Sequence, residues 1–249
     1  MEHKRNLDAT AVEIVTMAAV LDGADMSTPV PSCPQWDVAE LTRHTGRVHR
    51  WVRHLVSTRA PQMVRWKDIP MDVPDSSQQL PAWLAAGAEP LVAELSVDPS
   101  TAVWTFSPDQ TVGWWGRRQL HETVVHRCDA QLALGVEPTV ETEIALDGID
   151  ELIRGLLPHS GAPKKLAALG RGGGSLHVHA TDGAGEWTVV LTDSGFTAEV
   201  GHSKSTVAVR GTATDLLLLL WNRRTPDGPR FETFGDGELL AAWLRATVL

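Results

Sequence analysis

The residues of the chain that are best suited to chemistry lie in one segment, residues 118–129, which reads RQLHETVVHRCD. His126 follows Glu122 by four positions, and Asp129 follows His126 by three. On a helix of 3.6 residues per turn, this spacing places the three side chains on one stripe. A carboxylate and an imidazole presented in this way are two ligands for a divalent metal. His121 and His126 are five positions apart, so the segment is not the His-Glu-x-x-His pattern of metalloproteases.

A third metal ligand is predicted on a second amphipathic segment, residues 38–55. His44 lies on its inward stripe, whereas His49 and His54 lie off it; the apolar side of this stripe consists of Val38, Leu41, Thr45, Val48, Val52 and Leu55. Three protein ligands leave one coordination position open, as in catalytic zinc sites. The alternative is a metal-free arrangement, in which Glu122 and His126 form an intrahelical pair and His44 is a hydrogen-bonded core histidine.

Helices are needed to position these residues, and the first half of the chain is predicted to be helical. Asp37 is expected to cap the second helix, Gly135 to end the fourth, and residues 57–78 to form a long loop. On the first helix, the predicted inward face is Ala11, Ile14, Val15, Ala18 and Leu21. Apolar residues recur at three- and four-residue spacing in four segments, residues 11–21, 38–55, 80–95 and 112–134. Four helices with one long connection predict an all-α four-helix bundle.

The pattern changes after Pro138, and we expect two domains, residues 1–138 and 139–249. In the second domain, period-two alternation predicts strands of an antiparallel sheet over residues 176–180, 187–191, 196–200 and 207–209. Helices are predicted over residues 147–157, 216–223 and 239–248, the second of them capped by Thr214 and Asp215, with a connector over residues 161–175. The C-terminal domain is therefore predicted to be α+β.

Composition excludes several classes of function. Lys and Arg number 22 against 31 Asp and Glu, a formal charge of −9, which disfavours nucleic-acid binding because phosphate contacts need a concentrated basic face. No apolar run approaches the roughly 20 residues of a membrane span. Cys33 and Cys128 make no disulfide framework and are expected to be buried, inert thiols. With no secretory signal at the N-terminus, a cytoplasmic protein is predicted.

Three separated blocks carry a resemblance to a known family. The segment VPSCPQWDVAELTRH at residues 30–44 resembles the N-terminal signature of the mycothiol-dependent maleylpyruvate isomerase family, and residues 118–129 resemble its second signature. Four further segments are similar to the C-terminal domain of this family: HVHATDG at residues 177–183, GEWTV at residues 185–189, residues 216–223, and Gly235-Asp236. The resemblance implies a DinB-like metal-binding bundle followed by an α+β domain that resembles sterol carrier proteins.

The resemblance also implies roles for individual residues. The family holds zinc with one histidine of the second helix and with the glutamate and histidine of the fourth, which match His44, Glu122 and His126. It directs an arginine of the C-terminal domain toward the site, for which Arg223 is the best match and Arg224 the alternative. A guanidinium there is expected to bind a carboxylate of the substrate or the thiol cofactor through two parallel donors.

Asp129 is a candidate for orienting a ligating histidine from outside the metal's own ligands. The alternative is an ion pair on the helix surface with Arg127 or Arg43. Weaker candidates lie elsewhere in the chain. His177 and His179 alternate onto one strand face and are expected to be sheet-surface residues, because no third ligand is evident. Trp104, Trp114 and Trp115 either wall the pocket or fill the core.

The expected cofactor is Zn²⁺, and the expected cosubstrate is mycothiol or a similar low-molecular-weight thiol, whose reactive thiolate the metal charge favours at neutral pH. The predicted activity is isomerisation of, or S-transfer to, a small electrophilic metabolite. Two alternatives stay open, hydrolysis of an amide or thiol conjugate by a zinc-bound water and a noncatalytic metal- or ligand-binding module. The expected partners are these small molecules alone, with the chain as a monomer or a dimer.

Overall fold

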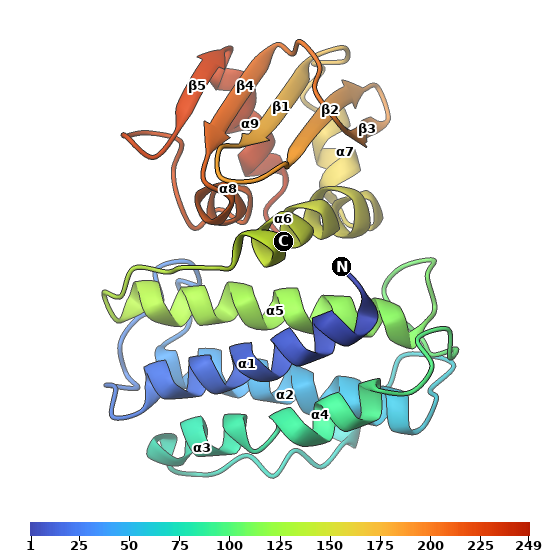
Figure 1. The fold of residues 1–249 in the computed structure, drawn as a ribbon, viewed down its shortest axis with the longest axis vertical. Coiled ribbons are helices and arrows are strands. Elements are labelled where there is room, and N and C mark those ends of the chain that lie inside the picture. The colour runs from blue at the N-terminus through green and yellow to red at the C-terminus, as the bar shows by residue number, and fades with distance from the viewer. The chain divides into compact units, whose positions relative to one another are not determined.

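The structure of the chain, a computed structural model, describes residues 1–249 and contains two compact units, Met1–Pro138 and Thr139–Leu249. The first unit is built from helices, and the second combines helices with a five-stranded sheet (Figure 1). The predicted fold class, a helical bundle followed by an α+β domain, is therefore confirmed. None of the helices has both the length and the apolar character needed to cross a membrane.

The N-terminal unit contains the predicted bundle, with one helix divided in two. The helix expected over residues 80–95 breaks at Gly87, where the Arg50 side chain comes so close that a Cβ would lie 3.0 Å from its Nη1. Arg50 lies over the Trp83 ring at 3.9 Å and donates a hydrogen bond to the Trp83 carbonyl. The helices are α1 (His3–Leu21), α2 (Val38–Ser57), α3 (Leu80–Ala85), α4 (Ala88–Leu95) and α5 (Val112–Ala133); two short 3₁₀ turns, Trp66–Asp68 and Ser77–Gln79, lie in the long loop.

Local capping interactions fix the ends of α2 and α5. The Asp37 carboxylate accepts a hydrogen bond from the Glu40 backbone N–H at 2.7 Å, which confirms the predicted cap of α2. Gly135 adopts φ +71°, and the next N–H, that of Val136, bonds to the Gln131 carbonyl. This is the Schellman arrangement that ends α5 where the sequence predicts.

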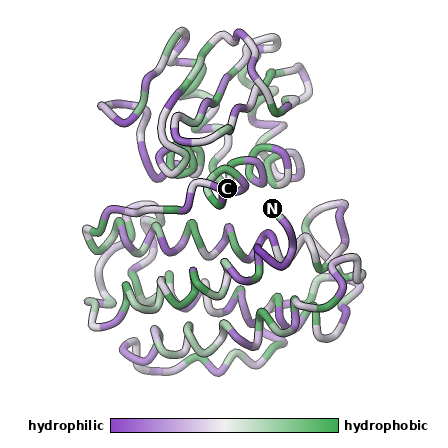
Figure 2. Tube along the Cα trace, viewed as in Figure 1, coloured by the Kyte–Doolittle hydropathy of each residue, from purple (hydrophilic) through white to green (hydrophobic).

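The buried faces of the helices follow the apolar stripes. All six predicted positions of α2 are buried, and α2 packs against α3, α4 and α5. On α1 the predicted face is partly wrong, because Val15 is 55% exposed while Leu7 and Met17 are buried. Helix α1 packs between α5 and the α3–α4 pair, which completes a four-helix arrangement. Figure 2 shows polar and apolar residues alternating along these helices.

The sheet of the C-terminal unit has the order β3-β2-β1-β4-β5 and is mixed, so the prediction of a purely antiparallel sheet is wrong. Strands β1 and β4 are parallel because residues 201–206 carry the chain from the edge strand β3 to the far side of β1. Strand β5 was not predicted, since all four of its residues are exposed and show no alternation. The strands are β1 (Ser175–Ala180), β2 (Glu186–Thr192), β3 (Gly195–Val200), β4 (Val207–Gly211) and β5 (Glu232–Gly235).

The helices of this unit differ from the predicted bounds. The first begins at Thr142 and continues as a π-helix over Glu151–Leu156, and α7 lies in the expected connector. Helix α8 begins earlier than predicted, because the side chain of Thr212, and not that of Thr214, accepts the hydrogen bond from the Asp215 N–H. The helices are α6 (Thr142–Asp150), α7 (Ala162–Ala167), α8 (Ala213–Leu220) and α9 (Gly237–Ala246).

The two faces of the sheet differ in chemistry. Helices α7, α8 and α9 pack on one face, where the apolar residues of each strand, such as Val178 and Val189, are buried (Figure 1). The pleat directs the alternate residues, among them His177, His179 and Glu186, to the opposite face. The sheet therefore has one apolar side and one side rich in titratable groups.

Candidate metal centre

The three predicted metal ligands lie together between α2 and α5. His44 Nε2 and His126 Nε2 are each 3.2 Å from the same oxygen, Oε1 of Glu122. All three ligand atoms lie within 4.8 Å of one another, and the two imidazole rings are 5.0 Å apart and nearly perpendicular. Two atoms that each bind a tetrahedral zinc at about 2.1 Å are about 3.4 Å apart. The distances from the Glu122 oxygen to the two imidazole nitrogens are therefore close to those between ligands of one zinc ion, so binding would require little movement of these side chains.

Arg118 holds the other oxygen of the Glu122 carboxylate. Its Nη2 donates a hydrogen bond to Glu122 Oε2 at 3.1 Å from one helical turn earlier on α5, and the residue is 6% exposed. Burial raises the pKa of Glu122, but the charge of His126, the hydrogen bonds from His126 and His44, and the charge of Arg118 outweigh it. The pKa therefore lies well below its usual value and the group is a carboxylate. The sequence analysis did not assign a role to Arg118, although it precedes Glu122 by four positions, a spacing that predicts an ion pair on one face of a helix.

His126 lies between two carboxylates. Its Nδ1 is 3.0 Å from Asp129 Oδ2, and its Nε2 faces Glu122. Burial lowers the pKa of His126, but the two carboxylates outweigh burial and raise it to about 9. In the metal-free protein the ring is therefore protonated at neutral pH and donates from both nitrogens. Metal binding at Nε2 must displace one proton, while the Nδ1–H remains on Asp129.

Asp129 is completely buried. The alternative, an ion pair with Arg127 or Arg43 on the helix surface, requires an exposed carboxylate. Its Oδ1 accepts a hydrogen bond from the Ser32 hydroxyl at 2.5 Å, and Ser32 precedes α2. The carboxylate thus has one oxygen on His126 and the other on Ser32. This geometry supports an orienting role for Asp129, and the part played by Ser32 was not foreseen.

Two tryptophans border the ligand set, whereas Trp104, Trp114 and Trp115 follow the second of their two alternatives and pack with other aromatic rings. The ring of Trp36 lies 4.7 Å from that of His44, and the ring of Trp66, which is 39% exposed, lies 5.9 Å from it. Trp66 stacks on Trp51, which is part of an aromatic cluster with Phe106 and the predicted residues Trp104, Trp114 and Trp115. Trp36 stands immediately before the cap of α2, within the segment 30–44 that resembles the N-terminal signature of the family.

His49 departs from its prediction. It is buried between α2 and α5, with Nε2 2.9 Å from Thr123 Oγ1, because α2 packs on more than one neighbour and its buried surface is wider than one stripe. Burial lowers the pKa of His49 to about 3, so the ring is neutral. The cysteines are also unlike each other, since Cys128 is buried as expected and Cys33 is only half-buried.

The arginine candidates follow α8 in the C-terminal unit. Asn222 adopts φ +60°, and the N–H of Arg223 bonds to the Leu218 carbonyl, so a Schellman turn presents Arg223 and Arg224. Arg224 forms an ion pair with the buried Asp215 carboxylate. Arg223 donates from Nη1 to the carbonyl of Trp221 at 2.6 Å. The two arginines therefore have different surroundings, and Arg224 is committed to a carboxylate of its own unit.

The expectation that His177 and His179 lack a third partner is wrong. Glu186 on β2 and His202 after β3 lie beside them on the same face of the sheet. Strand pairing brings these residues together, and the sequence alone does not show which residues pair.

Comparisons with known proteins cover both units. Residues 7–131 match the sequence model described as the mycothiol maleylpyruvate isomerase N-terminal domain, and residues 143–242 match that of the MDMPI C-terminal domain. No curated protein matches the chain. Among solved structures, a UbiJ-SCP2 ubiquinone synthesis protein is similar at 16% identity, with a TM-score of 0.33 over 44% of this chain and 93% of that chain.

Proposed function

Because the chain belongs to the mycothiol maleylpyruvate isomerase family, we propose that it is a zinc-dependent enzyme that uses mycothiol or a similar low-molecular-weight thiol. The proposed reaction is isomerisation of a small electrophilic metabolite, with transfer of the thiol to that metabolite as the related outcome. The observation that carries the proposal is the convergence of His44, Glu122 and His126.

We assign the metal to these three side chains. Two imidazoles and one carboxylate are a set that zinc accepts in catalytic sites, where a fourth position remains for substrate. Zinc bound there supplies a positive charge that favours the thiolate form of a thiol near neutral pH. Arg118 and Asp129 keep Glu122 and His126 oriented for binding, each through a hydrogen bond on the side of the ligand away from the shared position.

The remaining proposed roles concern the substrate. The thiolate sulfur forms a bond to an electrophilic carbon of a conjugated double bond, and the π-electron pair of that bond moves onto the conjugated carbonyl group, so the carbon–carbon bond becomes single and rotates. Return of the electron pair expels the thiolate and restores the double bond in the other geometry, whereas protonation of the adduct at the adjacent carbon retains the thiol and gives the S-transfer product. Arg223, the best match to the arginine of the family, is proposed to bind a carboxylate of the substrate or the thiol through two parallel donors, with Arg224 as the alternative. Trp36 and Trp66 provide apolar surface beside His44.

The test combines zinc content with thiol dependence, using maleylpyruvate and mycothiol as probes. The full chain is expected to bind zinc and to isomerise maleylpyruvate only when both zinc and mycothiol are present. His44→Ala should lose one zinc equivalent and the activity. His54→Ala, a change of a half-buried histidine on the same helix, is the matched control and should lose neither.

Three results would redirect the proposal. Activity without added thiol on a thiol conjugate or amide would favour hydrolysis. Loss of zinc in His44→Ala with no change in any measured rate would favour a noncatalytic binding module. A zinc content that is the same in His44→Ala and in the unmodified chain would overturn the metal assignment.

A further inference from the structure

A second group of imidazoles and a carboxylate lies on the sheet face opposite helices α7, α8 and α9. The register of β1 with β2 places His179 directly opposite Glu186 and His177 opposite Thr188, so these side chains share that face. His202 belongs to the crossover segment, residues 201–206, which leaves β3 and leads to β4. Residues from two strands and one connection therefore meet at one place.

Glu186 is the centre of this group. Its Oε1 lies 2.7 Å from His179 Nδ1, and its Oε2 lies 3.5 Å from His177 Nε2 and 3.4 Å from His202 Nδ1. The separations at Oε2 are close to the roughly 3.4 Å between two ligands of one tetrahedral zinc. They exceed the roughly 2.7–2.9 Å of a hydrogen bond between charged groups.

The surroundings of His177 also point to a missing ligand. The residue is only 5% exposed, and its buried Nε2 has no hydrogen bond of normal geometry, since the Glu186 carboxylate oxygen beside it lies 3.5 Å away. Buried polar side-chain atoms almost always have a hydrogen-bond partner, so an imidazole nitrogen left in this way requires an explanation. Its ring lies 4.7 Å from that of His202, edge to face, and both rings face Glu186 Oε2. A cation between the three atoms would satisfy the nitrogen.

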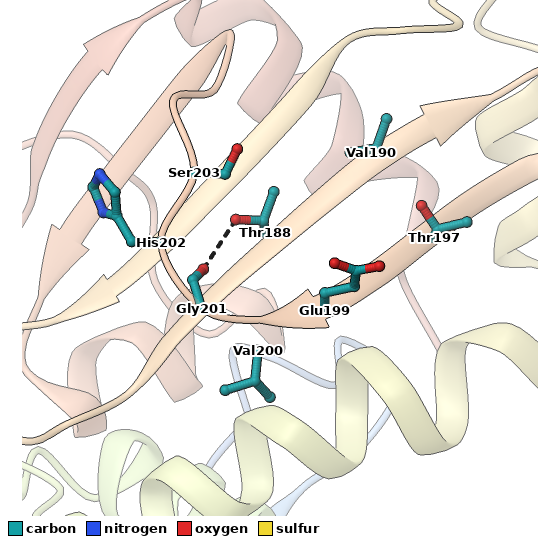
Figure 3. A pocket seen from close by; sticks show the side chains of 8 residues that line it. All are labelled: Thr188, Val190, Thr197, Glu199, Val200, Gly201, His202 and Ser203. Carbon is teal, nitrogen blue, oxygen red and sulfur yellow. Dashed lines mark hydrogen bonds between the residues drawn. The ribbon is translucent and has the colours of Figure 1, made fainter.

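The backbone holds His202 in place beside the strands. Gly201 donates its N–H to the Glu186 carbonyl at 2.9 Å, and its own carbonyl accepts a hydrogen bond from the Thr188 hydroxyl at 3.0 Å. Figure 3 shows this second bond, with His202 and Thr197 on opposite sides of the pocket and Glu199 between them. The start of the crossover segment is thus anchored to β2, and the imidazole of His202 stays near Glu186.

We propose that His177, Glu186 and His202 form a second site for a divalent transition metal, with zinc as the ion. His179 acts as the positioning residue, since it binds the Glu186 oxygen that faces away from the other two imidazoles. An ion bound there links β1, β2 and the crossover segment. The site is separate from His44, Glu122 and His126, and its existence does not depend on the proposed enzyme activity.

The experiment is a zinc titration of the metal-free full-length chain with a competing chromophoric chelator. We expect two equivalents in the unmodified chain and one in His202→Ala, whose side chain is 71% exposed and whose removal leaves the core intact. Glu186→Gln should also bind one equivalent. His159→Ala, an exposed histidine of the same unit outside the cluster, is the matched control and should still bind two. Circular dichroism reports whether each variant is folded.

Variants of the first site keep the two proposals distinguishable. Glu122→Gln should retain one equivalent, and Glu122→Gln combined with His202→Ala should retain none. A chain that binds a single equivalent and loses it in Glu122→Gln would overturn the second site but leave the proposed function standing. Two equivalents retained in folded His202→Ala and Glu186→Gln, or one lost in His159→Ala, would equally overturn it.

Discussion

The two groups consist of the same residue types, two histidines and one glutamate, but different secondary structure holds them. In the N-terminal unit two helices present His44, Glu122 and His126, and in the C-terminal unit two strands and a crossover segment present the other set. Each central carboxylate directs one oxygen to two imidazoles, while its other oxygen is bound by a third group, Arg118 on Glu122 and His179 on Glu186. The same arrangement, one carboxylate between two imidazoles with a third group on its other oxygen, therefore occurs on helices in one unit and on strands in the other.

The groups differ in what lies behind the ligands. The Nδ1 of His126, on the side away from Glu122, contacts the buried Asp129 carboxylate. Glu122 and Asp129 together raise the pKa of His126. For His177, burial and then the charge of His202 outweigh Glu186 and lower the pKa. The identity of the ligands alone therefore does not determine whether each histidine is protonated before a metal binds, because the surrounding charges and burial set its pKa.

The largest expected contrast is between the two central glutamates. Glu122→Gln should lower kcat/KM for mycothiol-dependent isomerisation on the order of 10³-fold, because it removes a metal ligand from the reacting site. Glu186→Gln should leave kcat/KM within about twofold. Steady-state kinetics with maleylpyruvate measure both. Equal losses in the two variants would show that the groups do not have separate roles.

The next contrast concerns the residues that hold the ligands. Asp129→Asn should weaken zinc binding at the N-terminal group about 10- to 100-fold, because the amide no longer supplies the charge that stabilises the His126 Nδ1–H. His179→Gln should weaken the C-terminal group about 10-fold or less, since Glu186 is partly exposed and water can replace the lost donor. Each is measured by chelator competition in a background that lacks the other site, and the opposite ranking would contradict the comparison.

The stability of the metal-free protein should depend on pH with opposite signs in the two groups. The pKa of His126 is raised from 6.5 to about 9, so its contribution to the free energy of unfolding is complete below pH 6.5 and is lost as pH rises through about 9. The pKa of His177 is lowered from 6.5, so its contribution is present above that pH and is lost as pH falls through the lowered value.

Thermal unfolding of the zinc-free chain from pH 5 to pH 10 tests both signs. His126→Gln should flatten the alkaline decrease in Tm. His177→Gln should remove part of the acidic decrease and leave the part that the buried His49 causes, because the pKa of His49 is also lowered, to about 3. An alkaline decrease that is unchanged in His126→Gln would mean that another group causes it.

The smallest expected effect is that of Ser32→Ala. Its hydroxyl donates to Asp129 Oδ1, and because Ser32 is partly exposed, water can take over part of the bond. We expect a loss of about 1 kcal/mol of stability and about a fivefold weaker zinc affinity at the N-terminal group. Ser27→Ala, which removes a similar bond to the exposed Asp25, is the control and should leave zinc affinity unchanged.

How far the sequence predicts the structure differs between the two units. Helix α2 and helix α5 follow from their caps at Asp37 and Gly135 and from apolar spacing, and this places His44, Glu122 and His126 on inward stripes. The contributions of Ser32 and Trp36 depend on how the segment before α2 folds back, which no periodicity describes.

In the C-terminal unit the alternation of apolar residues located four strands but not their partners. The parallel pairing of β1 with β4 and the fifth strand were missed, and so was the meeting of His177 with Glu186 and His202. Strand register is set by pairing between segments that are distant in sequence. The residues adjacent to a histidine in the sequence therefore do not show which residue lies opposite it on the neighbouring strand.

The sequence by itself determined the apolar stripe of α2, the start of α2 at Asp37, the end of α5 at Gly135, and the family, because these depend on short-range periodicity, capping and motifs. Only the tertiary structure decided which groups stand behind the ligands and which residues assemble on the sheet. The physical reason is range, since capping and periodicity act over a few residues, whereas burial, charge proximity and strand pairing join atoms far apart in the chain.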